Sequence, residues 1–266
     1  MPKTLPFGNK TIFYKALAEN DYKVLREFSR FFYKSNGIYQ KLCQYVAFMY
    51  RYDWYIVPEI FDDSVKEEKV LKDFSKMLNF LDNSYIKKTC GDMALKVMID
   101  GCYYGYVVST ADSVIIQELP VDYCRTRYSV GGMPAVEFNM AFFDTFPDIN
   151  YRMRVLNLFP DEFKKGYVLY KQGKLPLDFL GDKNGWFLLT PGLAFKFNMN
   201  GSDIPIFVNI IPALLDLDAA QDLDRRKQMQ KLLKIIIQKL PLDKNGDLIF
   251  DVDEARDIHN NAVAML

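Results

Sequence analysis

A stretch of about 29 residues without an internal Gly or Pro, from Pro212 to Leu240, is the strongest constraint on the fold of this chain. Pro212 suits the first turn of a helix, where the missing N–H of proline has no partner to lose, and Pro241 ends the stretch. The sequence therefore predicts one helix of about 43 Å. A coiled coil is ranked low, because the apolar positions keep no strict heptad. A helix longer than the globular mean is expected to pack against neighbouring elements or other subunits.

Charge is segregated along this predicted helix. Its first half is acidic and its second half is basic, an order that suits the helix macrodipole. The acidic residues are Asp216, Asp218, Asp222 and Asp224, and the basic residues include Arg225, Arg226, Lys227, Lys231 and Lys234. These five basic residues are candidate contacts with DNA phosphate or with acidic residues of a neighbouring subunit, and the sequence favours neither interpretation over the other.

The residues after Pro241 carry a turn signal. Asn245 and Gly246 lie between two apolar stretches and predict a two-residue β-hairpin turn, flanked by Asp243 and Asp247. A last helix is expected from residue 253 onward. The same stretch spaces its oxygen-bearing side chains like an EF-hand calcium loop, but the sixth position of that loop needs Gly and is Leu248 here. The position of the glycine therefore favours the hairpin.

The residues before the long helix alternate between helical and extended patterns, which predicts an α+β fold, mainly helical with a small antiparallel sheet. Helices are expected over 19–52 with a break at 35–37, over 66–99 with a break near 83–84, from about residue 150, and over 160–172. Strands are expected over 54–60, 101–109, 113–120, 123–130 and 135–143, with two more in 185–197. The successive strands indicate an antiparallel meander or one small sheet.

Composition narrows the function classes. The 34 basic and 34 acidic residues cancel, which gives no support to wholesale wrapping of nucleic acid. The 21 Phe and 17 Tyr suit an oligomer interface or an ordinary aromatic core, and the core is favoured. Arg125 and Arg127 share one face of a predicted strand, where a polar sheet face is favoured over a phosphate contact.

Signatures of catalysis and of cofactor binding are missing from the sequence. The single histidine, His259, is expected to be solvated or to cap a helix, and no Walker A or GxGxxG motif occurs. No two cysteines form a CxxC pair, so buried free thiols are expected at Cys43, Cys90, Cys102 and Cys124. We therefore expect no catalytic residue, no metal and no cofactor.

Two features of the sequence bear on the cellular compartment, the N-terminal residues and the length of the apolar runs. The N-terminal residues lack the apolar core of a signal peptide. Uninterrupted apolar runs of the ~18 residues that a membrane span needs do not occur. The sequence predicts a soluble chain that is made in a cytoplasm and has no membrane partner.

A further signal comes from five segments, which are SNGIYQKLCQYVAFMYRYDWYIVP (35–58), QELPVDYCRTRYSV (117–130), NGWFLLTPGLAFKF (184–197), IPIFVNIIPALLDLDAAQDLDRRK (204–227) and KIIIQKLPLDKNGDLIFDVDEARDIHNN (234–261). In order along most of the chain, they resemble the portal (head–tail connector) proteins of tailed bacteriophages, specifically a group from phages of gut bacteria. The resemblance implies a structural protein and not an enzyme: a homo-oligomeric ring of about twelve copies around the DNA channel at one capsid vertex. Such rings serve genome packaging and ejection and contact the terminase packaging motor, the capsid and the tail adaptor.

The resemblance also assigns parts of the chain. It implies a wing over residues 1–203, a stem helix over 204–240, a clip-like hairpin over 241–252 and the start of the returning stem helix over 253–266. The basic residues of the stem would contact DNA or the next subunit, and the turn at 243–247 would belong to the clip. Portals usually continue through a full second stem helix, so this sequence corresponds to a short variant or to a piece of a longer portal. The expected location is the virion, after assembly in the host cytoplasm.

Two other function classes remain open. The first is another head–tail connector of a phage, such as a collar or adaptor protein. The second, ranked below it, is a carboxylate-based hydrolase of unrecognised type. The mass of the assembled particle separates the portal from a monomer, and a deep pocket with several convergent carboxylates would favour the hydrolase.

Overall fold

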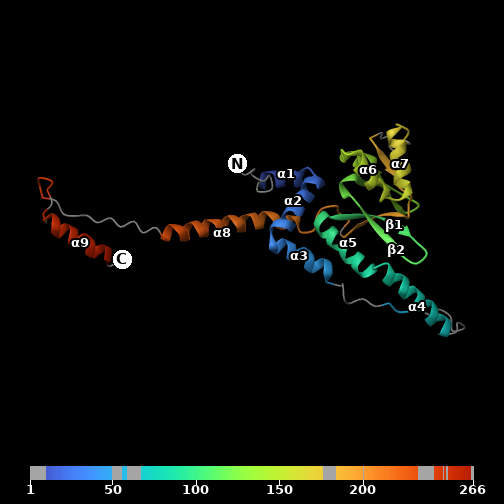
Figure 1. The fold of residues 1–266 in the computed structure, drawn as a ribbon, viewed down its shortest axis with the longest axis horizontal. Coiled ribbons are helices and arrows are strands. Elements are labelled where there is room, and N and C mark those ends of the chain that lie inside the picture. The colour runs from blue at the N-terminus through green and yellow to red at the C-terminus, as the bar shows by residue number, and fades with distance from the viewer. Residues whose placement is uncertain are drawn as a thin grey trace. The chain divides into compact units, whose positions relative to one another are not determined.

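The computed structural model describes residues 10–49, 56–58, 67–175, 184–199, 201–232, 243–247, 249 and 251–264. The chain divides into two compact units, Met1–Leu214 and Leu215–Leu266. Its fold is α+β and mainly helical, with two small antiparallel sheets, which confirms the predicted class (Figure 1). The division between the units falls inside the long helix α8 (Ile211–Leu232). The predicted wing ends earlier, at residue 203.

The first unit begins with three helices, α1 (Lys10–Ala18), α2 (Tyr22–Ser35) and α3 (Gly37–Phe48). Asn36 separates α2 from α3, because its Oδ1 accepts hydrogen bonds from the backbone N–H groups of Ile38 and Tyr39, each at 3.0 Å. This side-chain cap is the physical cause of the break that was predicted at 35–37. Helix α1 lies outside the helical stretch that was predicted to start at residue 19.

Helix α2 packs through the apolar stripe that its sequence predicts. Leu25, Phe28 and Phe32 recur every three or four residues and are buried. The ring of Phe28 meets that of Phe13 on α1 edge to face, with centroids 5.5 Å apart. Helix α3 in turn lies beside a later helix, α5 (Ile86–Asp100) (Figure 1).

The predicted break near residues 83–84 is confirmed by α4 (Glu67–Asn83) and α5 (Ile86–Asp100). Ser84 fixes this junction, since its hydroxyl donates to the carbonyl of Phe80 at 2.7 Å and accepts the N–H of Val114 at 2.8 Å. Gly101 ends α5 with φ +81°. A Cβ at this position would lie 2.4 Å from the carbonyl oxygen of Asp203, so only glycine fits.

Six strands form two separate sheets of three strands each within the described residues. The first sheet has the order β2-β1-β6, built from β1 (Cys102–Ser109), β2 (Val114–Leu119) and β6 (Ala194–Asn198). The second has the order β3-β4-β5, built from β3 (Cys124–Val130), β4 (Met133–Asn139) and β5 (Trp186–Leu188). Every pairing is antiparallel.

Two sequence predictions about this region were wrong. The strands do not form one meander or one sheet, because a 3-10 turn, η2 (Val121–Tyr123), carries the chain from β2 into the second sheet. The predicted strand over 135–143 ends at Asn139, and a 3-10 helix, η3 (Met140–Thr145), follows it. The side chain of Asn139 accepts the N–H of Ala141 at 3.0 Å and thereby starts that helix.

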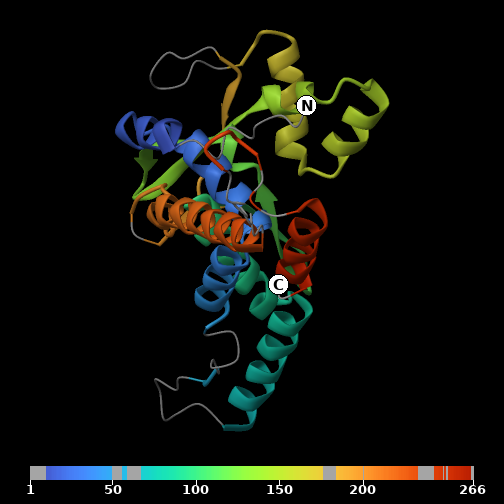
Figure 2. The same ribbon diagram turned by 90° about the vertical axis from the view of Figure 1, so that its left-hand side faces the viewer.

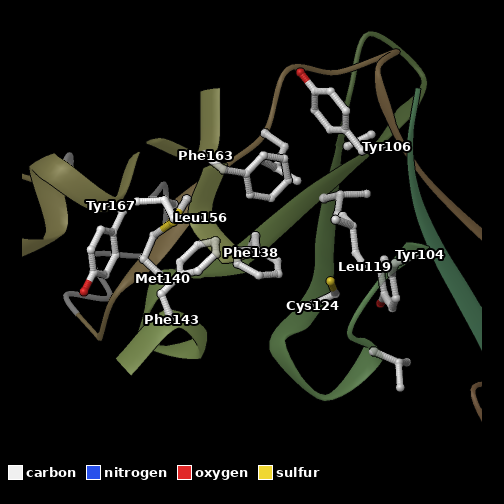
Figure 3. Packing of buried hydrophobic residues seen from close by; sticks show 14 of the residues in the cluster. Tyr104, Tyr106, Leu119, Cys124, Phe138, Met140, Phe143, Leu156, Phe163 and Tyr167 are labelled. Carbon is white, nitrogen blue, oxygen red and sulfur yellow. The ribbon is translucent and has the colours of Figure 1, made fainter. Parts of the chain in front are cut away.

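Two short helices, α6 (Ile149–Asn157) and α7 (Asp161–Lys171), pack on η3 and were both predicted (Figure 2). Between them and the sheets lies an aromatic core (Figure 3). Phe138 of β4 and Phe163 of α7 are both fully buried, with ring centroids 5.1 Å apart. Part of the aromatic surplus in the composition therefore serves this core, as was favoured.

The cysteines agree with expectation at three positions out of four. All four thiols are free, and Cys43, Cys102 and Cys124 are buried. Cys90, on α5, is exposed, so the prediction that it is buried was wrong. Of the stretch 54–60, which was expected to be extended, the structure describes only residues 56–58.

Candidate functional site

The helix α8 (Ile211–Leu232) is the candidate functional element that the sequence singled out, and its start belongs to the first unit. A 3-10 turn, η4 (Val208–Ile210), leads into it, with Val208 fully buried. Ile211 and Leu214 are buried as well, at 0% and 5% exposure, so the first turn is anchored by apolar burial. Pro212 is the second residue of the helix, which confirms the predicted start.

The next turns of α8 have a different environment. Every residue from Asp216 to Gln230 is exposed. These residues include apolar side chains on a helix that continues without interruption, and Leu217, Leu223 and Met229 are 40%, 54% and 64% exposed. A helix of this length gains little stability from its own backbone in water, because most helical stability in proteins comes from tertiary packing. Within the described residues, the second part of α8 therefore lacks the apolar packing that usually stabilises a helix of this length.

The charged residues of α8 occupy the positions that the sequence predicted. The four acidic residues and Arg225, Arg226 and Lys227 are all exposed. Arg225 Nη1 lies 3.9 Å from Asp222 Oδ1, at the outer limit of an ion pair, with side chains 78% and 68% exposed. Lys231 lies in the helix, and Lys234 lies outside the described residues. Of the five basic residues, Arg225, Arg226 and Lys227 are therefore presented to solvent.

The predicted clip turn has a defined geometry. Gly246 N–H donates to the carbonyl of Asp243 at 2.9 Å, and Asp243 N–H donates to the carbonyl of Asp247 at 2.7 Å. Gly246 has φ +88°, the left-handed conformation that glycine adopts without strain. The Asp243 carboxylate accepts the N–H of Lys244 at 2.6 Å, which ties that side chain to its own turn. Helix α9 (Val252–Ala264) follows, as predicted.

The turn type differs from the prediction. A two-residue type I′ turn requires positive φ at Asn245 as well as at Gly246, and Asn245 is not among the positive-φ residues of the described chain. The hydrogen bonds instead describe a three-residue loop, in which a turn is closed by a left-handed glycine. The sequence correctly identified Gly246 as the glycine of the turn. However, Gly246 is the third residue of the loop, whereas a two-residue turn would place it second.

Arg125 and Arg127 are held by a buried partner that the sequence reasoning missed. Arg125 Nε donates to Glu137 Oε2 at 2.6 Å, and Arg127 Nε donates to the same oxygen at 3.1 Å. Glu137 is fully buried, and the guanidinium of Arg125 also lies 3.9 Å from the ring centroid of Trp186. The available signal was a single carboxylate inside the apolar run of β4. These two arginines serve the sheet, which agrees with the favoured interpretation.

A second charged cluster, also missed, joins α2 to α5 and η2. Arg30 Nε lies 2.6 Å from Asp100 Oδ1, and its Nη1 lies 2.8 Å from Asp122 Oδ2. Arg26 Nη2 adds a contact of 2.9 Å to Asp122 Oδ1. Burial raises the pKa of Asp100, although Arg30 opposes the shift, whereas at Asp122 the two arginines outweigh burial and lower the pKa. Two arginines four residues apart on an aromatic helix were the signal that was available.

A cavity of about 270 Å³ opens beside this cluster and bears on the hydrolase hypothesis. Three carboxylates line it, those of Asp100, Glu118 and Asp122. Each is paired with a cation, since Lys96 Nζ lies 2.8 Å from Glu118 Oε1 and Arg30 holds the other two. The cavity therefore presents ion pairs that connect structural elements.

Three further observations concern the single histidine, metal ligands and membrane spans. His259 lies on α9 and is exposed. In the part of the chain that the structure describes, no group of three or more His, Cys, Asp or Glu residues is arranged to hold a metal ion. None of the helices in that part combines the length and the apolar character that a membrane span requires.

Searches against family models, curated proteins and solved structures found no match to this chain.

Proposed function

We propose that this chain is a structural subunit of the portal of a tailed bacteriophage. In this proposal about twelve copies form a ring at one capsid vertex, and phage DNA passes through its centre during packaging and ejection. The ring contacts the terminase packaging motor, the capsid and the tail adaptor. The support is the resemblance of five ordered segments, spread over residues 35–261, to portal proteins.

The observation that carries the proposal is the exposure of α8. From Asp216 to Gln230 each residue is exposed, and Leu217, Leu223 and Met229 are among them. A helix in a ring is covered by its neighbours on two sides and faces the channel on a third. Such a position would explain why the second part of α8 carries exposed apolar and charged residues all around.

The charge of the chain is compatible with a channel. DNA that moves through a ring needs weak contacts that do not depend on sequence, because tight binding of phosphate would stall its movement. A chain with 34 basic and 34 acidic residues and a local basic cluster on one helix suits this requirement better than a strongly basic chain.

The mass of the purified protein in solution tests the proposal. Native mass spectrometry and negative-stain electron microscopy are expected to show rings of about twelve subunits. A collar or adaptor protein would give a particle of different order or shape. A stable monomer at micromolar concentration would overturn the proposal.

Charge reversal on α8 supplies a second test. We expect the variant Arg225→Glu/Arg226→Glu/Lys227→Glu to fold, because all three side chains are exposed, but to impair ring assembly or DNA packaging. Circular dichroism checks the fold, and particle yield and genome content measure the function. A matched control reverses Lys69, Lys72 and Lys76, which are exposed on α4. Unchanged yield and genome content in the α8 variant would contradict the assigned role.

A further inference from the structure

A cavity of about 470 Å³ opens between helices α3 and α5, which lie side by side (Figure 1). Its volume falls within the range of about 300–1,000 Å³ that small-molecule sites occupy. The α5 wall of the cavity includes four residues spaced four apart, which are Ile86, Cys90, Ala94 and Met98. Residues at this spacing form one ridge along a helix, so they span about 18 Å of its axis. The cavity therefore extends along α5.

The room in this cavity comes from small side chains. Cys90, Gly91 and Ala94 line it from α5, and Ala47 lines it from α3. Gly91 is buried, and a Cβ at this position would lie 3.3 Å from the ring of Phe48, so the two helices approach each other closely here. Protein interiors are normally close-packed, whereas these small residues leave a space that no other side chain of the described residues fills.

Two exposed methionines also line the cavity. Met49, which follows α3, is 42% exposed, and Met199, which follows β6, is 56% exposed. Methionine is flexible and polarisable, and proteins use it on apolar surfaces that adapt to a ligand. A ligand in the cavity would remove apolar surface of both side chains from water, which favours binding of an apolar body.

Charge selects among apolar ligands. Lys87 is the only charged side chain among the described residues that line the cavity. It lies in the first turn of α5, where the helix dipole also favours an anion. One cation at the end of a long apolar wall complements a ligand that has one anionic group on an aliphatic chain.

We propose that this cavity binds one free, unbranched fatty acid, with its chain along α5 and its carboxylate at Lys87. The site goes beyond the proposed ring and does not depend on it. A free fatty acid fits better than a membrane phospholipid, because a phospholipid carries two chains and the ridge on α5 provides a wall for one. The second chain would then remain in water, at a cost that grows with its length.

Cys90 supplies the readout, because it lines the cavity and is exposed. Dodecanoate, added to the full chain below its micelle concentration, covers the thiol and should slow its modification by Ellman's reagent at least about tenfold at saturation. The affinity should rise about fourfold for each methylene from octanoate to dodecanoate, since each one that is buried contributes a similar free energy. Isothermal titration calorimetry measures the same affinities directly.

Variants separate the apolar wall from the charge. Ala94→Leu fills the middle of the cavity and should abolish protection of Cys90, whereas Ala111→Leu, the same change at an exposed position outside the cavity, should retain it. Lys87→Glu should weaken dodecanoate about fivefold and leave the affinity for uncharged dodecanol unchanged. Circular dichroism confirms the fold, and each rate is compared with that of the same variant without ligand.

Several outcomes would overturn the site. These are a wild-type chain that dodecanoate does not protect, equal protection of the Ala94→Leu variant, and an affinity that is independent of chain length. Protection of Cys90 that grows with protein concentration in the absence of ligand would assign the cavity to a second copy of the chain. Protection by phosphatidylglycerol vesicles but not by dodecanoate would assign it to a membrane surface. A monomeric chain that binds dodecanoate would overturn the ring and leave this site standing.

Discussion

Arg125 Nε lies 2.6 Å from Oε2 of Glu137, and the carboxylate of Glu137 is fully buried. This pair joins the neighbouring strands β3 and β4, where Arg125 and Glu137 are also register partners. Arg127 shares the same carboxylate from two residues further along β3. The second sheet therefore contains one buried anion between two cations, and we expect its stability to depend on that anion.

Removal of the Glu137 carboxylate tests this dependence. We expect Glu137→Gln to lower the free energy of unfolding by about 3 kcal/mol, because two largely buried guanidinium groups lose their counter-charge. Urea denaturation at fixed protein concentration measures the change. The matched control is Glu118→Gln, which breaks an exposed pair with Lys96 and should cost less than about 1 kcal/mol. Equal effects of the two variants would contradict the assigned role of Glu137.

Substitution of glycine by alanine is expected to change the stability of the protein by different amounts at three positions. Gly101→Ala should destabilise the protein by at least about 3 kcal/mol, because it adds a backbone clash to an unfavourable φ. Gly131→Ala meets no atom within 4 Å, so only its φ of +58° opposes the change, at about 1 kcal/mol. Gly37→Ala, in α3, has neither obstacle and should be neutral or slightly stabilising. Thermal unfolding ranks the three, and any other order contradicts the local geometry.

Acid should weaken the packing of α7 on η3 through Asp144. Burial alone would raise the pKa of Asp144, but hydrogen bonds from Lys171 and Tyr167 outweigh it and lower the pKa. Because the folded pKa lies below the unfolded value of about 4, the stabilisation is complete above that pH and is lost as the pH falls through the folded pKa. Asp144→Asn should therefore cost most near pH 7 and least in acid. Parallel stability curves for this variant and the wild type would refute the coupling.

The thiols should differ in reactivity. Burial raises the pKa of Cys43 to about 11 and that of Cys102 to about 12, and it raises the pKa of Cys124 well above its ordinary value. Cys90 is exposed. At pH 8 we expect Ellman's reagent to modify one thiol per folded chain rapidly, and Cys90→Ser should abolish that phase. Rapid modification of several thiols in the folded Cys90→Ser variant would contradict the buried positions.

Local signals in the sequence predicted the elements well. Asn36 marked the break between α2 and α3 because its side chain caps the second helix, and such a cap needs only neighbouring residues. The helix α8 followed from the absence of Gly and Pro, and its charges lie where the sequence placed them. The apolar run at 140–143 was misassigned, since a short buried run is compatible with a strand or with the 3-10 helix that forms.

Long-range partners could not be predicted from the same signals. The pairing of Arg125 with Glu137 depends on the register of β3 and β4, and Arg30 reaches Asp100 across 70 residues of sequence. The division of the strands between two sheets also depends on long-range partners, because β1 pairs with β6, a strand that lies far from it in the sequence. For the candidate site, the charges of α8 could be read from the sequence, whereas the exposure of every residue from Asp216 to Gln230 became visible only in the structure.

Residues 186–198 complete both sheets, since β5 pairs with β4 and β6 pairs with β1. During synthesis, β1 and β4 can pair early with β2 and β3, but they leave the ribosome long before β6 and β5. Each then has an unpaired edge, and such edges can pair with strands of other chains. The late arrival of one short segment closes both edges together. Newly made chains that stop before residue 186 would thus be prone to aggregate, and the demand on chaperones would end abruptly once that segment emerges.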